Sequence, residues 1–272
     1  MSDLDTLRKK IDALDTELLR LLNERATLAK EIGVIKNRAC LPIYSPDREM
    51  KLLRSLVERS EGPLRPEAIR AIYREIMSAS LALEKDIAIA CLGPSGSPAH
   101  QAALGRFGSS VRYRHGATVA EVFAETSNEH ADCGVVPLEE PGHGFTAPTL
   151  DCLASADLRI CAEIVSDPAG NARFIVLGRQ LNQPSDTDRS MILLRIEDKA
   201  GALVSALEPF RKLGINLVHF ASRPASGETA ETLFFVEADG HLQDLEKSGL
   251  LVDLAANCRE VKILGSYPKP RL

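Results

Sequence analysis

The feature that most constrains the fold is a heptad pattern of apolar residues near the N-terminus, which one arginine interrupts. The apolar residues recur in alternating steps of four and three, which places them on one face of a single long helix. Arg25 occupies the one remaining position of this seam. Because a guanidinium in an apolar seam is costly without an anionic partner, we expect the seam to line a buried anion site. The apolar seam residues are Leu7, Ile11, Leu14, Leu18, Leu21, Leu28, Ile32 and Ile35.

Residues 1–85 are predicted to form an all-helical domain of three helices. The first is expected from Asp3 to about Asn37, the second begins at Pro46, and the third runs from Pro66 to Glu84. Three helices with so long a seam cannot bury their apolar faces within one chain. We therefore expect an intertwined homodimer in which each long helix packs on the partner's copy, alone or as a dimer of dimers.

The pattern changes at about residue 86, where short apolar strands begin to alternate with helices. The βαβαβ order over residues 86–178 predicts a small, mostly parallel sheet. Residues 179–189 are polar and contain a proline, which is typical of a linker. The βαββαβ order over residues 190–272 predicts a ferredoxin-like domain. The fold class is therefore multidomain, with one all-α and two α/β parts.

Composition and charge exclude several classes of function. The net charge is −5 and no basic stripe stands out, which argues against a nucleic-acid partner. No apolar run approaches the roughly 20 residues that a membrane span needs, and the N-terminus opens with polar residues. The six cysteines are scattered and form no CxxC motif, so we expect reduced thiols rather than metal ligands or disulfides. These features together predict a cytoplasmic protein that binds neither membranes nor metals.

Four segments of the helical region carry a specific pattern. They read LRKKIDALD from Leu7, LLNER ending at Arg25, IGVIK ending at Lys36, and DRE from Asp47. These segments resemble the all-helical chorismate mutases. The order of the three domains resembles the chorismate mutase–prephenate dehydratase family, the P-proteins of phenylalanine biosynthesis. The resemblance implies an isomerase that converts chorismate to prephenate without a cofactor or a metal.

The same resemblance assigns residues of the helical region to the substrate. Chorismate is a dianion whose Claisen rearrangement needs neither a nucleophile nor a base. Fixed arginines impose a geometry on its carboxylates, and a lysine at the ether oxygen stabilises the polar transition state. The implied catalytic residues are Arg8 from the partner subunit, Arg25 and Arg48 on substrate carboxylates, Lys36 and Glu84 on the ether oxygen, Glu49 on the ring hydroxyl, and Ser80 near the ring carboxylate.

Residues 92–103 and 134–140 resemble motifs of prephenate dehydratases, but the functional positions differ. The threonine of the family's Thr-Arg-Phe segment is Ala172 here, and its Asn-Ser pair is Glu140-Pro141. The family's second lobe belongs before this segment, where only residues 166–170 form a short loop. We therefore expect a truncated, vestigial dehydratase domain without dehydratase activity.

The C-terminal domain resembles ACT regulatory domains in two short motifs, Gly-Ala-Leu and Ser-Arg-Pro. The resemblance implies that L-phenylalanine binds between two such domains. The alternative is a domain retained only for dimerisation. The candidate ligand-binding residues are Gly201, Ala202, Leu203, Ser222, Arg223 and Pro224.

Two other functions stay open from the sequence. One is a non-catalytic amino-acid sensor in which all three domains have decayed, and the intact set of mutase residues argues against it. The other is a working bifunctional mutase and dehydratase. Ala172 and the absence of a second lobe argue against that reading.

Overall fold

A computed structural model describes residues 3–39, 44–165, 172–185, 187–225 and 231–269 of the chain. Residues 166–170, where the sequence predicts a short loop in place of a second lobe, lie outside the described residues. The chain divides into two compact units. The first contains residues 1–44, 53–87 and 107–112, and the second contains residues 45–52, 88–106 and 113–272.

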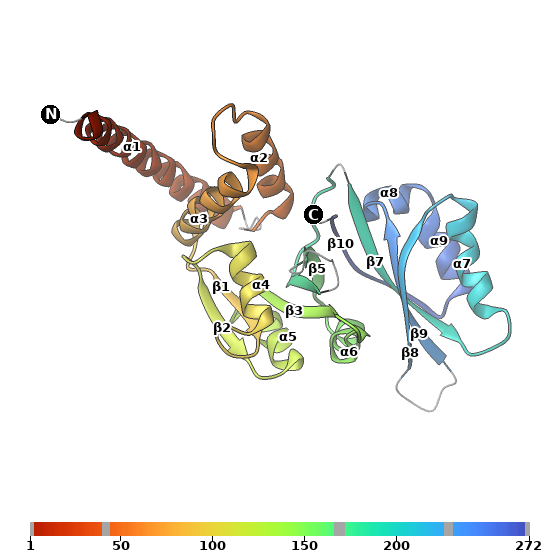
Figure 1. Cartoon of the computed structure of the whole chain (residues 1–272). Coiled ribbons are helices and arrows are strands. Elements are labelled where there is room, and N and C mark those ends of the chain that lie inside the picture. Colours follow the sequence, from red (N-terminus) through yellow and green to blue (C-terminus); the bar gives the residue numbers. More distant parts are fainter. Residues whose placement is uncertain (1–2, 40–43, 166–171, 186, 226–230, 270–272) are drawn as a thin grey trace. The chain divides into compact units, whose positions relative to one another are not determined.

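The helical region has the predicted elements. Helix α1 spans Asp3–Arg38, α2 spans Pro46–Glu58 and α3 spans Pro66–Glu84 (Figure 1). Acidic residues in the first turn of α1 and basic residues in its last turn complement the helix dipole. Helix α1 packs along α3.

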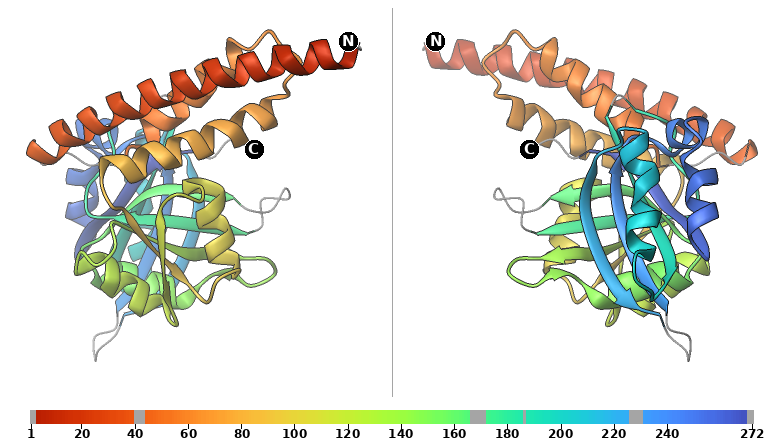
Figure 2. Two further views of the ribbon diagram at one scale, coloured as in Figure 1. Left: turned by 90° about the vertical axis from the view of Figure 1, so that its left-hand side faces the viewer. Right: turned by 90° about the vertical axis from the view of Figure 1, so that its right-hand side faces the viewer.

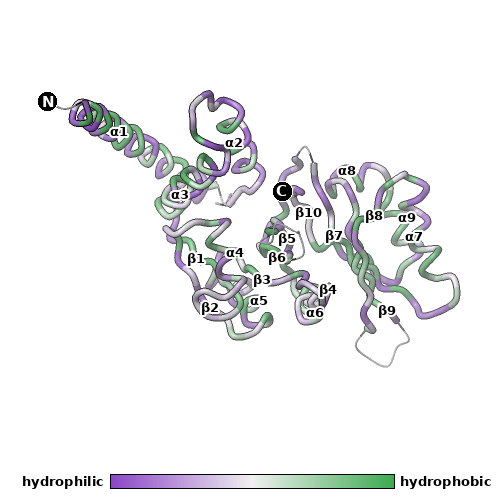
Figure 3. The backbone as a smooth tube through the Cα atoms, viewed as in Figure 1, coloured by the Kyte–Doolittle hydropathy of each residue, from purple (hydrophilic) through white to green (hydrophobic). Residues whose placement is uncertain are grey.

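The apolar seam of α1 remains exposed in the single chain. Leu14, in the first half of α1, has 69% of its surface exposed, and Leu28, in the second half, has 60%. Apolar and polar residues alternate along the whole helix (Figure 3). Leu14 and Leu28 therefore belong to an apolar stripe that is exposed along α1 in the single chain.

Strands and helices alternate in the middle of the chain. The sequence missed β4 and α6, and the expected mostly parallel sheet is wrong, because β3 pairs with β6 and β6 with β5 in antiparallel fashion. Strands β1 and β3 are parallel. The elements are β1 Ala88–Leu92, α4 Pro98–Phe107, β2 Arg112–Gly116, α5 Val119–Ser127, β3 Cys133–Glu140, β4 Gly144–Phe145, α6 Ala147–Ser155, β5 Arg159–Val165 and β6 Arg173–Gly178.

The C-terminal segment contains the predicted βαββαβ order. Its strands lie in the order β10-β7-β9-β8, and each neighbouring pair is antiparallel. The last helix is divided at Gly249, whose backbone has a φ of +82°. The elements are β7 Asp188–Glu197, α7 Ala202–Lys212, β8 Leu217–Pro224, β9 Glu231–Asp239, α8 Leu242–Lys247, α9 Leu250–Asn257 and β10 Glu260–Pro268.

The two α/β segments share one sheet instead of forming separate sheets joined by a linker. Strand β10 lies parallel to β5, with Gly265 opposite Ile160, and continues the order β2-β1-β3-β6-β5-β10-β7-β9-β8. A side chain at residue 265 would collide with the Ile160 backbone. Helices α7 and α9 cover the C-terminal strands on one face (Figure 2). One apolar core contains residues of both segments, among them Leu153 and Phe235.

The structure contains no helix, among the described residues, that is both long and apolar enough to span a bilayer.

Candidate functional site

Arg25 of the α1 seam turns toward α3, where it meets a buried hydroxyl. Its guanidinium donates a hydrogen bond to Oγ of Ser80. The Ser80 hydroxyl donates in turn to the Ile76 carbonyl oxygen, at 2.8 Å. The neutral hydroxyl does not balance the charge of the arginine. Arg25 is therefore a half-buried cation whose charge Ser80 does not neutralise, as the predicted anion site requires.

Lys36 and Glu84 form the second polar pair between α1 and α3. The lysine Nζ lies 2.9 Å from Oε2 of Glu84, and the two side chains are only 16% and 12% exposed. Glu84 lies one turn after Ser80 on α3, as the i, i+4 spacing predicts. The structure thus brings together Arg25, Lys36, Ser80 and Glu84 along one helix pair.

Gly33 allows α1 to approach α3 beside this pair. A Cβ atom on Gly33 would lie 2.6 Å from Cα and 2.8 Å from the carbonyl oxygen of Glu84. These are backbone atoms, which cannot move aside as a flexible side chain does. Glycine here is therefore a requirement of the close approach that pairs Lys36 with Glu84.

Gly33→Ala is expected to lower the stability of the helix pair, although alanine favours helices. Because the added methyl group meets backbone atoms, we expect a cost near the upper end of about 1–3 kcal/mol, above the helix-propensity gain of about 1 kcal/mol. Gly105→Ala, on α4, is the matched control, because nothing lies within 4 Å of the methyl group added there. Urea denaturation followed by circular dichroism compares the two variants. Equal stability of Gly33→Ala and the wild type would contradict the close approach.

Arg8 stands apart from this cluster in the same chain. Its side chain is 66% exposed and lies 3.8 Å from Asp5 on the same helix. At 1.5 Å per residue, Arg8 is about 25 Å from Arg25 and about 40 Å from Lys36 along α1. One chain therefore cannot bring Arg8 to the Lys36–Glu84 pair.

Arg48 and Glu49 lie in the first turn of α2. Arg48 is exposed, whereas Glu49 forms an ion pair with Arg106 of α4 at 3.1 Å. The two side chains of that pair are 20% and 18% exposed. No motif or periodicity in the sequence pointed to Arg106, because it lies near the end of an ordinary helix far along the chain from Glu49.

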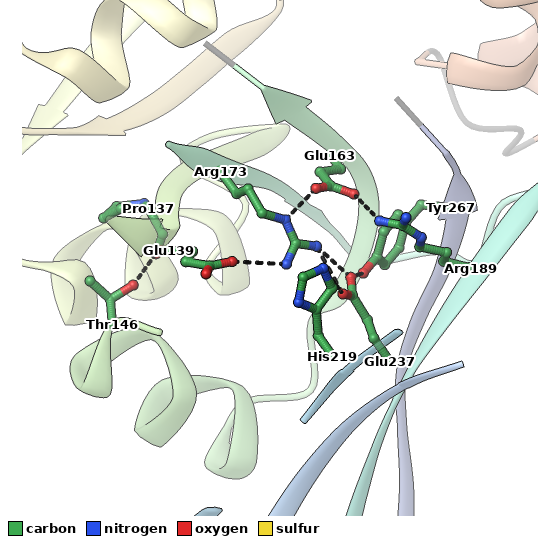
Figure 4. A network of polar contacts seen from close by, with 9 residues as sticks. All are labelled: Pro137, Glu139, Thr146, Glu163, Arg173, Arg189, His219, Glu237 and Tyr267. Carbon is green, nitrogen blue, oxygen red and sulfur yellow. Dashed lines mark hydrogen bonds and ion pairs between the residues drawn. The ribbon is translucent and has the colours of Figure 1, made fainter. Parts of the chain in front are cut away.

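Arg173, which follows the expected catalytic position at Ala172, lies in a buried network of polar contacts (Figure 4). Its guanidinium donates to the carboxylates of Glu163, Glu237 and Glu139, with Nη2 2.7 Å from the Glu237 carboxylate. Burial alone would lower the pKa of Arg173, but the Glu163 and Glu237 carboxylates raise it overall. Arg173 is therefore a permanent buried cation.

The network joins strands of both α/β segments. The side chains of Arg173, Glu163 and Glu237 are at most 4% exposed. Tyr267 donates its hydroxyl to Glu237, and burial followed by the Glu237 charge raises the pKa of this tyrosine. The guanidinium of Arg173 is therefore engaged by three carboxylates of its own chain.

The candidate ligand residues of the C-terminal segment fall in two places. Gly201 precedes α7 with a φ of +83°, and with Ala202 it lines a depression of about 440 Å³. Among the described residues, that lining excludes Ser222, Arg223 and Pro224, which lie on β8. Leu203 packs instead against the core under the helices.

Arg223 already has a partner in the chain. Its guanidinium binds the Asp151 carboxylate of α6 through two hydrogen bonds of 2.9 and 2.7 Å. Bidentate arginine–carboxylate pairs are strong and directional. A ligand carboxylate that engaged Arg223 would therefore have to compete with Asp151.

No group of three or more histidine, cysteine, aspartate or glutamate side chains, within the part of the chain that the structure describes, could hold a metal ion.

Two family models match the chain in succession. One described as chorismate mutase type II matches residues 7–85, and one described as prephenate dehydratase matches residues 89–169. The bifunctional chorismate mutase/prephenate dehydratase of Aquifex aeolicus (strain VF5) is 34% identical and covers 100% of this chain and 99% of that protein. That alignment runs over 360 positions, whereas the chain has 272 residues.

A second relative and a solved structure are also similar to this chain. The bifunctional chorismate mutase/prephenate dehydratase of Neisseria gonorrhoeae is 28% identical, with 96% of each chain covered. The X-ray structure of prephenate dehydratase from Streptococcus mutans matches with a TM-score of 0.58 and 30% identity, covering 66% of this chain and 97% of that chain.

Proposed function

The chain belongs to the bifunctional chorismate mutase/prephenate dehydratase family, and we propose that it converts chorismate to prephenate. The observation that carries this proposal is the set of polar pairs between α1 and α3, Arg25 with Ser80 and Lys36 with Glu84. A cation beside a buried hydroxyl and a second cation beside a carboxylate suit a dianionic substrate that must be folded and held.

The chemistry follows from the charges of these groups. Arg25 and Arg48 would bind the substrate carboxylates, and Lys36 would stabilise the negative charge that develops on the breaking ether bond. Glu84, when protonated, would donate to the same oxygen. Glu49 would accept from the ring hydroxyl, and Ser80 would support the ring carboxylate. No covalent intermediate is needed, so the residues act by position and charge alone.

A homodimer supplies the remaining arginine. Arg8 is about 40 Å along α1 from Lys36, so it can reach a Lys36–Glu84 pair only in another copy of the chain. The exposed seam of α1, with Leu14 at 69% exposure, offers the surface for that copy. An antiparallel pairing of two α1 helices would build two equivalent sites, each from both chains.

We further propose that the dehydratase-like part is inactive. Ala172 has no hydroxyl to act as an acid, and Arg173 beside it is buried in its network of carboxylates. The 360-position alignment of a 272-residue chain supports the loss of the second lobe. A bifunctional enzyme is the second candidate, favoured by the names of the relatives from Aquifex aeolicus and Neisseria gonorrhoeae.

Prephenate supplied directly separates the two candidates. The purified protein is expected to leave prephenate unchanged at neutral pH beyond its spontaneous decay, since Ala172 has no hydroxyl that could protonate the departing hydroxyl group. Phenylpyruvate is measured by its absorbance in alkali, with an active prephenate dehydratase as the positive control. Enzyme-dependent phenylpyruvate would establish the bifunctional enzyme.

The C-terminal segment is proposed to be an ACT domain. Its strand order β10-β7-β9-β8 with helices on one face supports the ferredoxin-like assignment. Because Gly201 and Arg223 do not line one depression within the chain, we place the L-phenylalanine site between two copies. Breaking the two hydrogen bonds between Arg223 and Asp151 would then account for part of the free-energy cost of ligand binding.

A further inference from the structure

We propose that Arg106, on α4 of the dehydratase-like part, is a positioning residue for the chorismate mutase reaction and acts through Glu49. This inference rests on the proposed mutase function and on the assignment of Glu49 to the substrate's ring hydroxyl. It gives the dehydratase-like part a function that does not depend on dehydratase activity.

The ion pair is the first observation. Nη2 of Arg106 lies 3.1 Å from Oε2 of Glu49, and neither side chain is more than 20% exposed. Ion pairs in this environment are screened less by solvent and salt than those on the open surface. The pair therefore restrains the direction in which the Glu49 carboxylate points.

The compact units are the second observation. Residues 45–52, the beginning of α2, belong to the same compact unit as residues 88–106. The first turn of α2 is thus built against the dehydratase-like part.

Positioning and substrate binding by Glu49 are compatible. An ionised carboxylate has two oxygens with about four acceptor positions, so an arginine on one side does not prevent a hydroxyl from donating on the other. Without a fixed partner, a glutamate has several rotatable bonds and loses conformational entropy when a ligand orders it. Arg106 would remove part of that loss before chorismate arrives.

A double-mutant cycle tests the coupling. The kcat and KM for chorismate are measured for the full-length wild type, Arg106→Gln, Glu49→Gln and the double variant. Arg106→Gln is expected to lower kcat/KM by about tenfold, the equivalent of one charge-assisted hydrogen bond. In the Glu49→Gln background the same replacement should have almost no further effect. Arg106→Lys should recover part of the loss, because it keeps the charge.

The outcomes separate the possible failures. Losses that multiply in the double variant, or an Arg106→Gln enzyme with wild-type kinetics, would overturn the inference. A Glu49→Gln enzyme with wild-type kinetics would overturn it too, by removing the residue through which Arg106 acts. A wild type that does not consume chorismate would instead refute the proposed function. Arg112→Gln is the matched control, since its pair with Asp86 is exposed and should leave the kinetics unchanged.

Discussion

Lys36→Ala is expected to lower the kcat for chorismate rearrangement by about 10²- to 10³-fold, the usual cost of removing one preorganised group that stabilises developing charge. The lysine is 16% exposed and held by Glu84, so its ammonium is fixed before the substrate binds. Lys30→Ala, at an exposed position on the same helix, is the control and should be fully active. The measurement is the initial rate of chorismate loss. A Lys36→Ala enzyme with near-normal kcat would show that the reaction is centred elsewhere.

The Lys36→Ala chain can also be used to test the proposed homodimer. Arg8→Ala should also be inactive, because in the proposed homodimer each site takes this arginine from the partner subunit. Co-expressing the Arg8→Ala and Lys36→Ala chains should restore about a quarter of the wild-type activity, since half of the dimers are mixed and each mixed dimer has one intact site. Absence of any recovery in a verified mixed dimer would contradict the crossing of Arg8.

Arg173→Met is expected to destabilise the α/β unit by about 3–5 kcal/mol, because it leaves the Glu163 and Glu237 carboxylates buried without their cation. Those carboxylates are 1% and 0% exposed, so water cannot replace the guanidinium. Chemical denaturation measures the free energy of unfolding. Chorismate mutase kinetics under native conditions should stay close to wild type as long as the unit remains folded.

A surface pair provides the comparison for this variant. Arg211 on α7 pairs with Glu208 and is 75% exposed, so Arg211→Gln should change stability by less than about 1 kcal/mol. A similarly small effect of Arg173→Met would mean that the buried network is not the joint between the two segments. It would then leave Arg173 open to a role in substrate binding.

The helical region could be predicted closely from the sequence, because its signals are local. The heptad seam, the proline at the start of α2 and the i, i+4 spacing of Ser80 and Glu84 each involve few residues. Arg25 and Ser80 were each predicted as site residues, whereas the hydrogen bond between them is visible only in the folded chain. The Glu49–Arg106 pair could not be found in this way, since no sequence periodicity links α2 to α4.

The α/β part was harder for a physical reason. Apolar strands of similar length do not reveal their direction, so the antiparallel pairing of β3, β6 and β5 was missed. The continuation of the sheet from β5 to β10 depends on Gly265, whose role is visible only beside Ile160. From the sequence, Arg173 was interpreted as part of a degenerate Thr-Arg-Phe motif. The carboxylates around it are visible only in the folded chain.

The most direct test of the proposed function is to incubate purified full-length protein with chorismate and identify the products. Loss of chorismate absorbance is followed, and the products are then treated with acid or alkali to distinguish prephenate from phenylpyruvate. We predict enzyme-dependent consumption of chorismate with prephenate as the product. No loss of chorismate between about pH 5 and pH 8, the range in which proteins of this kind are usually most stable, would contradict the chorismate mutase assignment.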